Sequence, residues 1–231
     1  MTAVPESEWS LVIPAYNEAQ RIGDLLDQLQ DFAGEVIFVC DGTDETGEII
    51  ESFRDSHAGL HFRCIRAPHR LGKGGAVLAG MQAAAGRYVG YMDADGSTPL
   101  HQMRLLYAAL ETCDGAIGSR WVEGSVLVRP QGLMRRIESR AFNFLVRILF
   151  SLTYNDTQCG AKVFTSAAVR EVSPLIRITG FAFDVELLWR LRQRGFAIHE
   201  VPIEWRNSES SKVDGSDAMR MLASLVRIRF G

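Results

Sequence analysis

Short apolar runs alternate with amphipathic stretches through the first half of the chain, and this alternation restricts the possible folds more than any other feature. The runs have the length of buried strands, whereas the stretches between them keep helical spacing, as in Ile22, Leu25 and Leu29. The predicted strands are Ser10–Pro14, Glu35–Cys40, His61–Arg66, Tyr88–Met92 and Gly115–Gly118. Such alternation with continuously apolar strands is typical of an α/β fold, in which helices cover both faces of a mostly parallel sheet.

The second half of the chain is less regular. Its predicted elements are a loop over 119–132, a helix at about Met134–Leu152, a polar turn followed by a short strand, a helix at about Asp184–Arg194, a strand Ala197–Trp205 and a final helix Asp217–Phe230. The sequence contains no repeat and no linker-like segment, so we expect one domain over residues 1–231. Within it, residues 119–153 form a loop and an amphipathic helix.

Charge is divided unevenly between the two halves. Residues 1–118 carry 8 Lys and Arg against 17 Asp and Glu, and residues 119–231 carry 17 against 11. This asymmetry predicts an acidic, metal-binding half and a basic half that meets anions. Nucleic acid is not an expected partner, because the basic residues lie among aliphatic ones and the first half is acidic.

The cysteines and the start of the chain indicate a cytoplasmic protein. Cys40, Cys64, Cys113 and Cys159 are scattered without a CxxC pair, so we expect free thiols, mostly buried, in a reducing compartment. The first residues lack the pattern of a signal peptide, and no run of 18 uncharged apolar residues predicts a membrane span.

Polar residues follow the first two predicted strands, where an α/β sheet binds its ligands. The residues after the first strand are Pro14, Ala15, Tyr16, Asn17 and Glu18. A dinucleotide-binding fold would carry GxGxxG there, and this chain does not. Asn17 is also a suitable helix cap. Asp41, after the second strand, can accept hydrogen bonds from a base or ribose, or cap the following helix.

A pair of carboxylates follows the strand at Tyr88–Met92. Asp93 and Asp95 are separated by Ala94, so both can turn toward one pocket. Oxygen ligands of this kind suit Mg²⁺ or Mn²⁺, which keeps further positions for water and diphosphate. The ion would neutralise charge on a departing nucleoside diphosphate. A solvated acidic turn is the alternative.

A glycine-rich turn over His69–Ala76 leads into a helix. Its backbone amides and Lys73 can bind phosphate. It is not a Walker loop, because Ala67 stands where the first glycine is needed and Gly74 replaces the Ser or Thr. An ATPase is therefore disfavoured.

Taken in order, Asn17-Glu18, Asp41, the RLGKGGA turn and DADGS resemble the family 2 glycosyltransferases. Further motifs are similar to the dolichyl-phosphate β-glucosyltransferase branch: Asp156–Lys162, Phe181–Leu188, Trp205 and Ser211–Val213. The resemblance covers residues 10 to 230. It departs from the family at Cys40, where an acidic residue is usual, and at Ser210, where this branch commonly has glycine.

The resemblance implies a GT-A fold and an inverting transfer from a nucleotide sugar. It implies metal ligation by Asp93 and Asp95 and catalytic roles for Asp184 and Asp95. The expected nucleotide-sugar site is Pro14, Ala15, Tyr16, Asn17, Glu18, Asp41, Lys73, Asp93, Ala94 and Asp95. The expected acceptor-phosphate contacts are Arg129, Lys162, Ser211 and Lys212. UDP-glucose and a polyprenyl phosphate are the leading substrates; GDP-mannose and a non-lipid acceptor are alternatives.

Asp184 opens a predicted helix, so an N-cap is its alternative role. A phosphate-monoester acceptor has a second pKa of about 6 and is largely dianionic at neutral pH. Such a nucleophile hardly needs a base. We therefore expect Asp184 to orient the acceptor or support positive charge on the sugar.

The composition of two predicted helices indicates that the protein binds to a membrane surface. The segment around Met134–Leu152 combines several arginines with Phe142, Phe144 and Ile148, and Asp217–Phe230 repeats this composition. Basic amphipathic helices bind anionic lipid peripherally, here on the cytoplasmic face. A core helix or a homodimer contact is the alternative.

Two other classes remain open. A sugar-phosphate nucleotidyltransferase also uses a parallel sheet and acidic metal ligands, but is expected to carry its glycine-rich loop after the first strand. A non-enzymatic lipid-surface module with a degenerate fold would not need Asp93, Asp95 and Asp184 intact.

Overall fold

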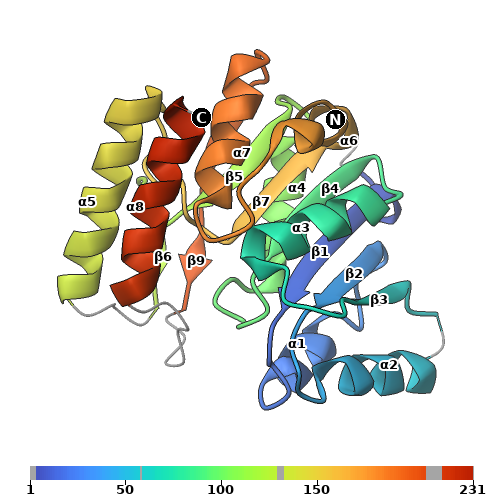
Figure 1. Cartoon of the computed structure of the whole chain (residues 1–231). Coiled ribbons are helices and arrows are strands. Elements are labelled where there is room, and N and C mark those ends of the chain that lie inside the picture. Colours follow the sequence, from blue (N-terminus) through green and yellow to red (C-terminus); the bar gives the residue numbers. More distant parts are fainter. Residues whose placement is uncertain (1–3, 58, 129–132, 207–214, 231) are drawn as a thin grey trace.

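The computed structural model describes residues 4–57, 59–128, 133–206 and 215–230, and in them a seven-stranded sheet lies between helices (Figure 1). Its strands are β1 (Trp9–Ala15), β2 (Glu35–Cys40), β3 (Phe62–Arg66), β4 (Tyr88–Met92), β5 (Gly115–Ser119), β7 (Ala161–Thr165) and β8 (Ile198–Pro202). A two-stranded sheet pairs β6 (Val126–Leu127) with β9 (Glu204–Trp205). The helices are α1 (Ile22–Gln28), α2 (Thr46–Ser56), α3 (Gly72–Ala83), α4 (Leu100–Ala109), α5 (Leu133–Phe150), α6 (Ser166–Val172), α7 (Phe183–Gln193) and α8 (Gly215–Phe230), with short 3-10 turns at Glu6–Glu8 and Ser173–Leu175.

The large sheet has the order β3-β2-β1-β4-β7-β5-β8. Neighbouring strands are parallel except at β7, which runs antiparallel to both β4 and β5. The prediction of a mostly parallel sheet is confirmed. Because β7 runs the other way, its first residue Ala161 pairs with Met92 at the end of β4. The turn before β7 therefore reaches the same edge as the loops after β1, β2 and β4.

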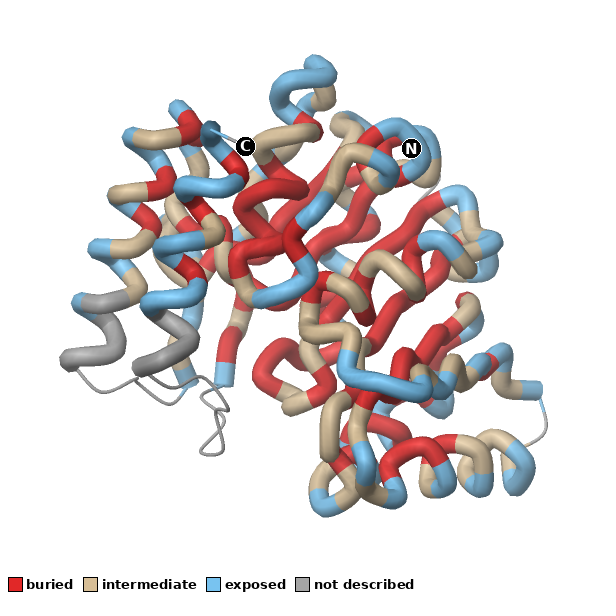
Figure 2. Tube along the Cα trace, in the orientation of Figure 1, coloured by how far each residue is buried: buried red, intermediate tan, exposed pale blue. Residues whose placement is uncertain are grey.

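Helices bury both faces of the sheet, which explains why its strands are continuously apolar. Along β1, Leu11 and Ile13 belong to a core shared with α1, α2 and α4. Val12 between them belongs to a second core, shared with α3, α6 and α7. Figure 2 shows the buried strands running through the middle of the molecule.

The helices α5 and α8 lie side by side at one end of the fold (Figure 1). Val146 and Phe150 of α5 and Leu225 and Ile228 of α8 are buried in the second core. Much of the opposite side of both helices is exposed (Figure 2). Within the described residues, no helix has both the length and the hydropathy needed to span a bilayer.

Three details of the second half differ from prediction. The predicted loop 119–132 contains the short strand β6, which pairs with β9. The expected strand Ala197–Trp205 is divided into β8 and β9, because Pro202 cannot continue donating to a strand ladder. The helix α6, which directly follows β7, is not anticipated by the sequence pattern. The three helices predicted with bounds in this half are confirmed as α5, α7 and α8, within two residues at each end.

Candidate active site

The loop after β1 is tied to the loop after β2 by Asn17. This residue has a left-handed φ of 53°, and its Oδ1 accepts hydrogen bonds from the backbone N–H groups of Thr43 at 2.8 Å and Asp44 at 3.3 Å. A Cβ at Gly42 would overlap Asn17, so this approach requires glycine. Asn17 does not cap α1, since Arg21 occupies the position before that helix. Its role is to fix the shape of this edge.

Asp41 orders the glycine-rich turn. Its buried carboxylate Oδ2 accepts hydrogen bonds from the backbone N–H groups of Leu71 at 2.8 Å and Gly72 at 3.0 Å. Gly72 has a left-handed φ of 75°, and a side chain there would come within 2.6 Å of the Thr179 carbonyl oxygen. Asp41 therefore stabilises the turn that enters α3, rather than capping the next helix in the chain, α2.

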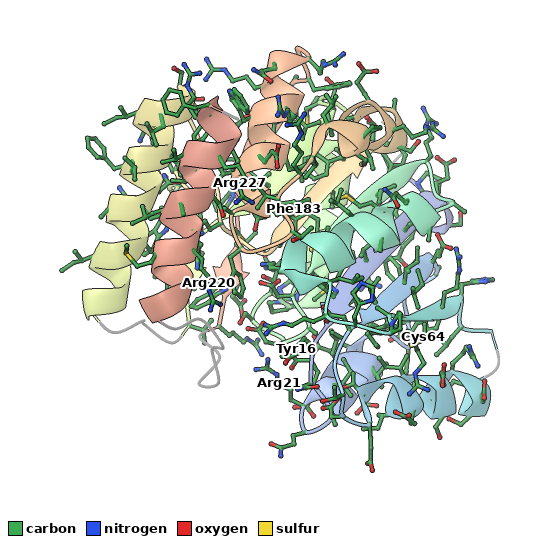
Figure 3. All side chains as sticks on the ribbon, in the orientation of Figure 1. Tyr16, Arg21, Cys64, Phe183, Arg220 and Arg227 are labelled. Carbon is green, nitrogen blue, oxygen red and sulfur yellow. The ribbon has the colours of Figure 1, made fainter. Side chains whose placement is uncertain are left out.

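Two basic residues pair with the side chains after β1. The guanidinium carbon of Arg70 lies 4.1 Å from the centre of the Tyr16 ring, a cation–π contact. Arg21 forms an ion pair with the buried Glu18, and Figure 3 shows Tyr16 and Arg21 in the same region. The bond to Glu18 raises the pKa of Arg21 although partial burial opposes this, and the nearby carboxylate of Asp95 adds to the rise.

Asp93 follows β4 and binds Lys73. The Lys73 Nζ lies 2.8 Å from Asp93 Oδ1 and 3.1 Å from Oδ2. Desolvation raises the pKa of Asp93; the Lys73 ammonium opposes this, and the Asp95 carboxylate adds to the rise. The backbone of Gly160, in the turn before β7, lies so close that a Cβ there would overlap the Asp93 carboxylate.

Asp95 and Ala94 complete the acidic turn. Asp95 Oδ1 accepts a hydrogen bond from the Ser97 N–H at 3.0 Å, which fixes the turn. Ala94 is buried in the core between the two acidic residues. The structure thus places Lys73, Asp93 and Asp95 in one neighbourhood, as the sequence predicts for a donor site.

Asp184 lies in the first turn of α7 and is buried. Ala182 occupies the N-cap position, so Asp184 is not the cap. Its Oδ1 accepts hydrogen bonds from the Tyr91 hydroxyl and from Lys162 Nζ at 2.5 Å, and Lys73 Nζ lies 4.0 Å from its Oδ2. Burial by itself raises the pKa of Asp184, but the two lysines and the hydrogen bonds outweigh it, so the pKa is lowered. The carboxylate is held in its charged form.

Lys162 is fully buried, with 0% of its side chain exposed. Lying beside Tyr91 across the β4–β7 pairing, it donates hydrogen bonds to Asp184 and to the carbonyl oxygen of Cys159. The sequence predicts an acceptor-phosphate contact for Lys162. In the structure its ammonium faces Asp184, so it joins the site as the charge partner of a carboxylate.

A buried ion pair that is not predicted from the sequence lies beside these residues. Asp156 accepts hydrogen bonds from Arg120 Nε at 2.7 Å, Nη2 at 2.8 Å and the backbone N–H at 3.0 Å. The guanidinium also lies 5.3 Å from the centre of the Trp205 ring. Burial lowers the pKa of Arg120, but Asp156 outweighs this and raises it. Both Asp156 and Trp205 belong to motifs that carry the family resemblance.

The residues after β4 fit a divalent cation. Asp93 and Asp184 pair with the ammonium groups of Lys73 and Lys162, and the carboxylate of Asp95 lies nearby, which leaves this set with one excess negative charge. Lys73 already provides positive charge at Asp93. In the part of the chain that the structure describes, no three His, Cys, Asp or Glu side chains form a metal cluster. An ion held by two carboxylates keeps its other coordination positions for diphosphate oxygens and water.

Three expected acceptor contacts, Arg129, Ser211 and Lys212, lie outside the described residues. The four cysteines are free thiols, as predicted; Cys40 and Cys159 are buried, and Cys64 and Cys113 are partly exposed.

Comparison with known sequences identifies the family. The sequence profile described as Glycosyl transferase family 2 matches residues 10–172. The dolichyl-phosphate beta-glucosyltransferase of Dictyostelium discoideum is 32% identical over 240 residues, covering 96% of this chain and 73% of that protein. The enzyme of the same name from Drosophila melanogaster is 33% identical over 228 residues, covering 90% and 70%.

Comparison with solved structures supports the fold. Glucosyl-3-phosphoglycerate synthase from Mycobacterium tuberculosis superposes with a TM-score of 0.71 at 20% identity, over 96% of this chain and 80% of that chain. The same synthase has been solved with Mn²⁺, UDP and its glucosylated product. A mannosyltransferase from Pyrobaculum calidifontis, in complex with GDP-Man and Mn²⁺, gives a TM-score of 0.67 at 19% identity, covering 97% and 65%.

The predicted GT-A fold and the resemblance to the dolichyl-phosphate β-glucosyltransferase branch are confirmed by these matches. With the acidic turn after β4, the glycine-rich turn before α3 and a family match over most of its length, this chain belongs to glycosyl transferase family 2.

Proposed function

We propose that this chain transfers glucose, with inversion, from UDP-glucose to a polyprenyl phosphate at the cytoplasmic face of a membrane. It acts as one domain over residues 1–231, with residues 119–153 on the acceptor side. The observation that carries the proposal is the linked set Lys162–Asp184–Lys73–Asp93 at the carboxyl edge of the sheet. Sequence relatives named dolichyl-phosphate beta-glucosyltransferases support the choice of sugar and acceptor.

The donor lies over the loops after β1, β2 and β4. In this proposal Pro14 to Glu18 and Asp41 enclose the nucleotide, and the Tyr16 ring, backed by Arg70, offers a flat surface to the base. Asp93 and Asp95 hold Mg²⁺ or Mn²⁺, which when bound neutralises charge on the diphosphate. Lys73, freed from part of its pairing with Asp93, turns its ammonium to the phosphate oxygens.

Asp184 stabilises charge rather than removing a proton. A phosphate-monoester acceptor is largely dianionic at neutral pH and attacks without a general base. The lowered pKa of Asp184 makes its carboxylate a poor proton acceptor, which agrees with this role. A fixed negative charge instead favours the positive charge that develops at the anomeric carbon.

Lys162 and Tyr91 position Asp184, and the acceptor phosphate meets other side chains. Both side chains are fully buried and both donate to Asp184 Oδ1. Direct phosphate contact is therefore assigned to Arg129, Ser211 and Lys212, as the sequence predicts.

The paired helices α5 and α8 support docking on a membrane. Each leaves an apolar stripe exposed, made of Ile137, Phe144 and Ile148 on α5 and Met219, Leu222, Val226 and Phe230 on α8. Exposed arginines flank the stripes: Arg140, Arg147, Arg220, Arg227 and Arg229. Figure 3 labels Arg220 and Arg227 along α8. Such a surface attracts anionic headgroups while its apolar side chains enter the interface.

A donor screen tests the reaction. The protein is incubated with polyprenyl phosphate, Mg²⁺ or Mn²⁺, and either UDP-glucose or GDP-mannose, and the lipid product is identified by mass. We expect hexosyl-phosphoryl-polyprenol and UDP from UDP-glucose. A nucleotidyltransferase would give no lipid product here and would instead release inorganic diphosphate from UTP and a sugar 1-phosphate, supplied in a separate incubation. Failure of every donor with intact protein would contradict the proposal.

A vesicle experiment tests the membrane surface. We expect co-sedimentation with anionic vesicles at low salt and release at high salt, because exposed charges are screened. If the apolar stripes cover a second copy instead, light scattering will give a dimer that does not bind vesicles at low salt. That result would refute a membrane-facing surface.

A further inference from the structure

Two cysteines face each other beside the nucleotide loops, and the proposed transfer reaction does not use them. Cys40 ends β2 and Cys64 lies in β3, with their Sγ atoms 3.6 Å apart. Phe38 is the register partner of Cys64, so the cysteines are displaced by two residues on the same face of neighbouring strands. Cys40 is buried, whereas Cys64, labelled in Figure 3, is partly exposed.

The surroundings favour Cys64 as the reactive thiol. The hydrogen bond from Cys40 lowers the pKa of Cys64, and Arg66 and Arg54 act in the same direction, while burial and Glu51 oppose them. The thiolate is the nucleophilic form of cysteine. A pocket of about 250 Å³ opens between the end of β2 and the start of α2, with Cys40 and Arg66 in its wall. Cys64 is not part of this wall but is itself partly exposed, so a small reagent can reach both thiols.

We propose that Cys40 and Cys64 form a dithiol modification site, at which a low-molecular-weight disulfide such as glutathione disulfide creates a reversible intramolecular disulfide. The Cys64 thiolate attacks one sulfur of the reagent, forms a mixed disulfide and releases one glutathione thiolate. The Cys40 thiol then gives up its proton and attacks the Cys64 sulfur, releasing the second glutathione. Two protein thiols are oxidised by two electrons, and the reagent is reduced to two thiols.

Closing the bond moves the strand that carries Cys64. A disulfide needs an S–S distance of about 2.05 Å, so the sulfur atoms must approach by about 1.5 Å. The strand β3 is at the edge of the sheet and pairs only with β2 among the described strands, so it can yield. Disulfides formed under strain are more easily reduced, which makes the modification reversible.

Formation of the disulfide also affects the nucleotide site, and this consequence rests on the proposed function. Cys40 is bonded directly to Asp41, whose carboxylate holds the backbone of Leu71 and Gly72. The closed bond also pulls Cys40 toward β3, and this shift of Cys40 disturbs these hydrogen bonds and the turn before α3. We expect weaker binding of the nucleotide while the disulfide is present.

Peptide mapping tests the chemistry without any use of transferase activity. The folded, reduced protein is treated with glutathione disulfide, remaining thiols are alkylated, and the digest is analysed by mass spectrometry. We expect a Cys40–Cys64 cross-linked peptide, a protein mass lower by two hydrogens, and reversal by dithiothreitol. Cys64→Ser should abolish this product and Cys113→Ser should leave it. Mixed disulfides alone, or cross-links involving other cysteines, would overturn the assignment.

UDP binding in the presence of Mn²⁺, measured by calorimetry, tests the coupling. Oxidation should weaken binding by about tenfold, equivalent to one ordinary hydrogen bond, and dithiothreitol should restore it. Cys64→Ser should bind UDP as the reduced protein does, with or without the oxidant. A cross-linked protein of unchanged UDP affinity would overturn the coupling. Failure of the reduced protein to bind UDP would contradict the proposed function instead.

Discussion

Replacing Lys162 by methionine removes one side of a buried ion pair. The Lys162 Nζ lies 2.5 Å from Asp184 Oδ1, and the side chains are 0% and 3% exposed. Methionine fills similar space without the charge, so the partners that Asp184 keeps among the described residues are the Tyr91 hydroxyl and Lys73, the latter 4.0 Å away. Breaking a buried pair from one side costs about 3–5 kcal/mol, and we expect a loss of that size in the free energy of unfolding.

The matched control is Arg194→Met. Arg194 Nη1 lies 2.7 Å from Glu171 Oε1, a comparable distance, but the two side chains are 46% and 47% exposed. Exposed pairs contribute about 0–1 kcal/mol, so this variant should lose less than that. The double variant Lys162→Met with Asp184→Asn should recover part of the stability lost by Lys162→Met, because it removes the unpaired charge.

The pH dependence has a definite sign. In the wild type the pKa of Asp184 is lowered, so its contribution to stability is complete above the unfolded-state pKa of about 3.9 and is lost as the pH falls through the lower folded value. Without Lys162, burial raises that pKa and the protonated carboxyl is favoured in the folded state. The deficit of Lys162→Met relative to wild type should therefore shrink as the pH is lowered.

Urea unfolding followed by circular dichroism, repeated from neutral to mildly acidic pH, measures these differences. Equal losses for Lys162→Met and Arg194→Met, or a deficit independent of pH, would refute the reasoning.

Three further predictions concern catalysis, the metal and the membrane. Asp184→Asn should lower the turnover number by less than about a hundredfold, which is the smallest effect typical of losing a general base. The loss should also be smaller than that in Asp93→Ala. A larger loss in Asp184→Asn than in Asp93→Ala would show that the carboxylate acts as a base. Gly160→Ala should displace the Asp93 carboxylate and raise the Mn²⁺ concentration for half-maximal activity by about 10- to 100-fold; an unchanged metal titration would contradict this. Phe144→Ser with Ile148→Ser, at side chains 65% and 61% exposed, should release the protein from anionic vesicles without loss of thermal stability; binding equal to wild type would exclude this stripe.

The first half of the fold is predictable because strands that are buried on both faces of the sheet are apolar along nearly their whole length. The strands β2 and β4 read as uninterrupted apolar runs, and both are buried along nearly their whole length. In contrast, α6 follows β7 without an intervening loop, so nothing in the apolar pattern marks where the strand ends and the helix begins. It depends on Thr165, whose side chain accepts a hydrogen bond from the Ala168 N–H, and on the burial of Ala168 and Val169.

The candidate site is predictable in its members and not in its pairings. Motif residues mark Asp93, Asp184, Lys73 and Lys162, but which charge faces which depends on how separate elements pack. The antiparallel direction of β7 sets Lys162 beside Tyr91 and turns its ammonium inward to Asp184. The sequence contains no short-range signal for this arrangement, and so it suggests a phosphate contact instead.

The same reason applies to Arg120. It follows β5, and its carboxylate partner Asp156 is 36 residues further along the chain. The ion pair of Arg21 with Glu18 is easier to predict from the sequence, because the two residues are three positions apart. At this spacing, side chains on one helical turn meet.

The most direct test is diffraction from a crystal soaked with Mn²⁺ and UDP-glucose, using the anomalous signal of manganese. We predict one ion bound by the Asp93 and Asp95 carboxylates and by both phosphates of the donor, with Lys73 moved toward a phosphate oxygen. Density for the donor with the two carboxylates turned away, and manganese bound elsewhere, would contradict the account.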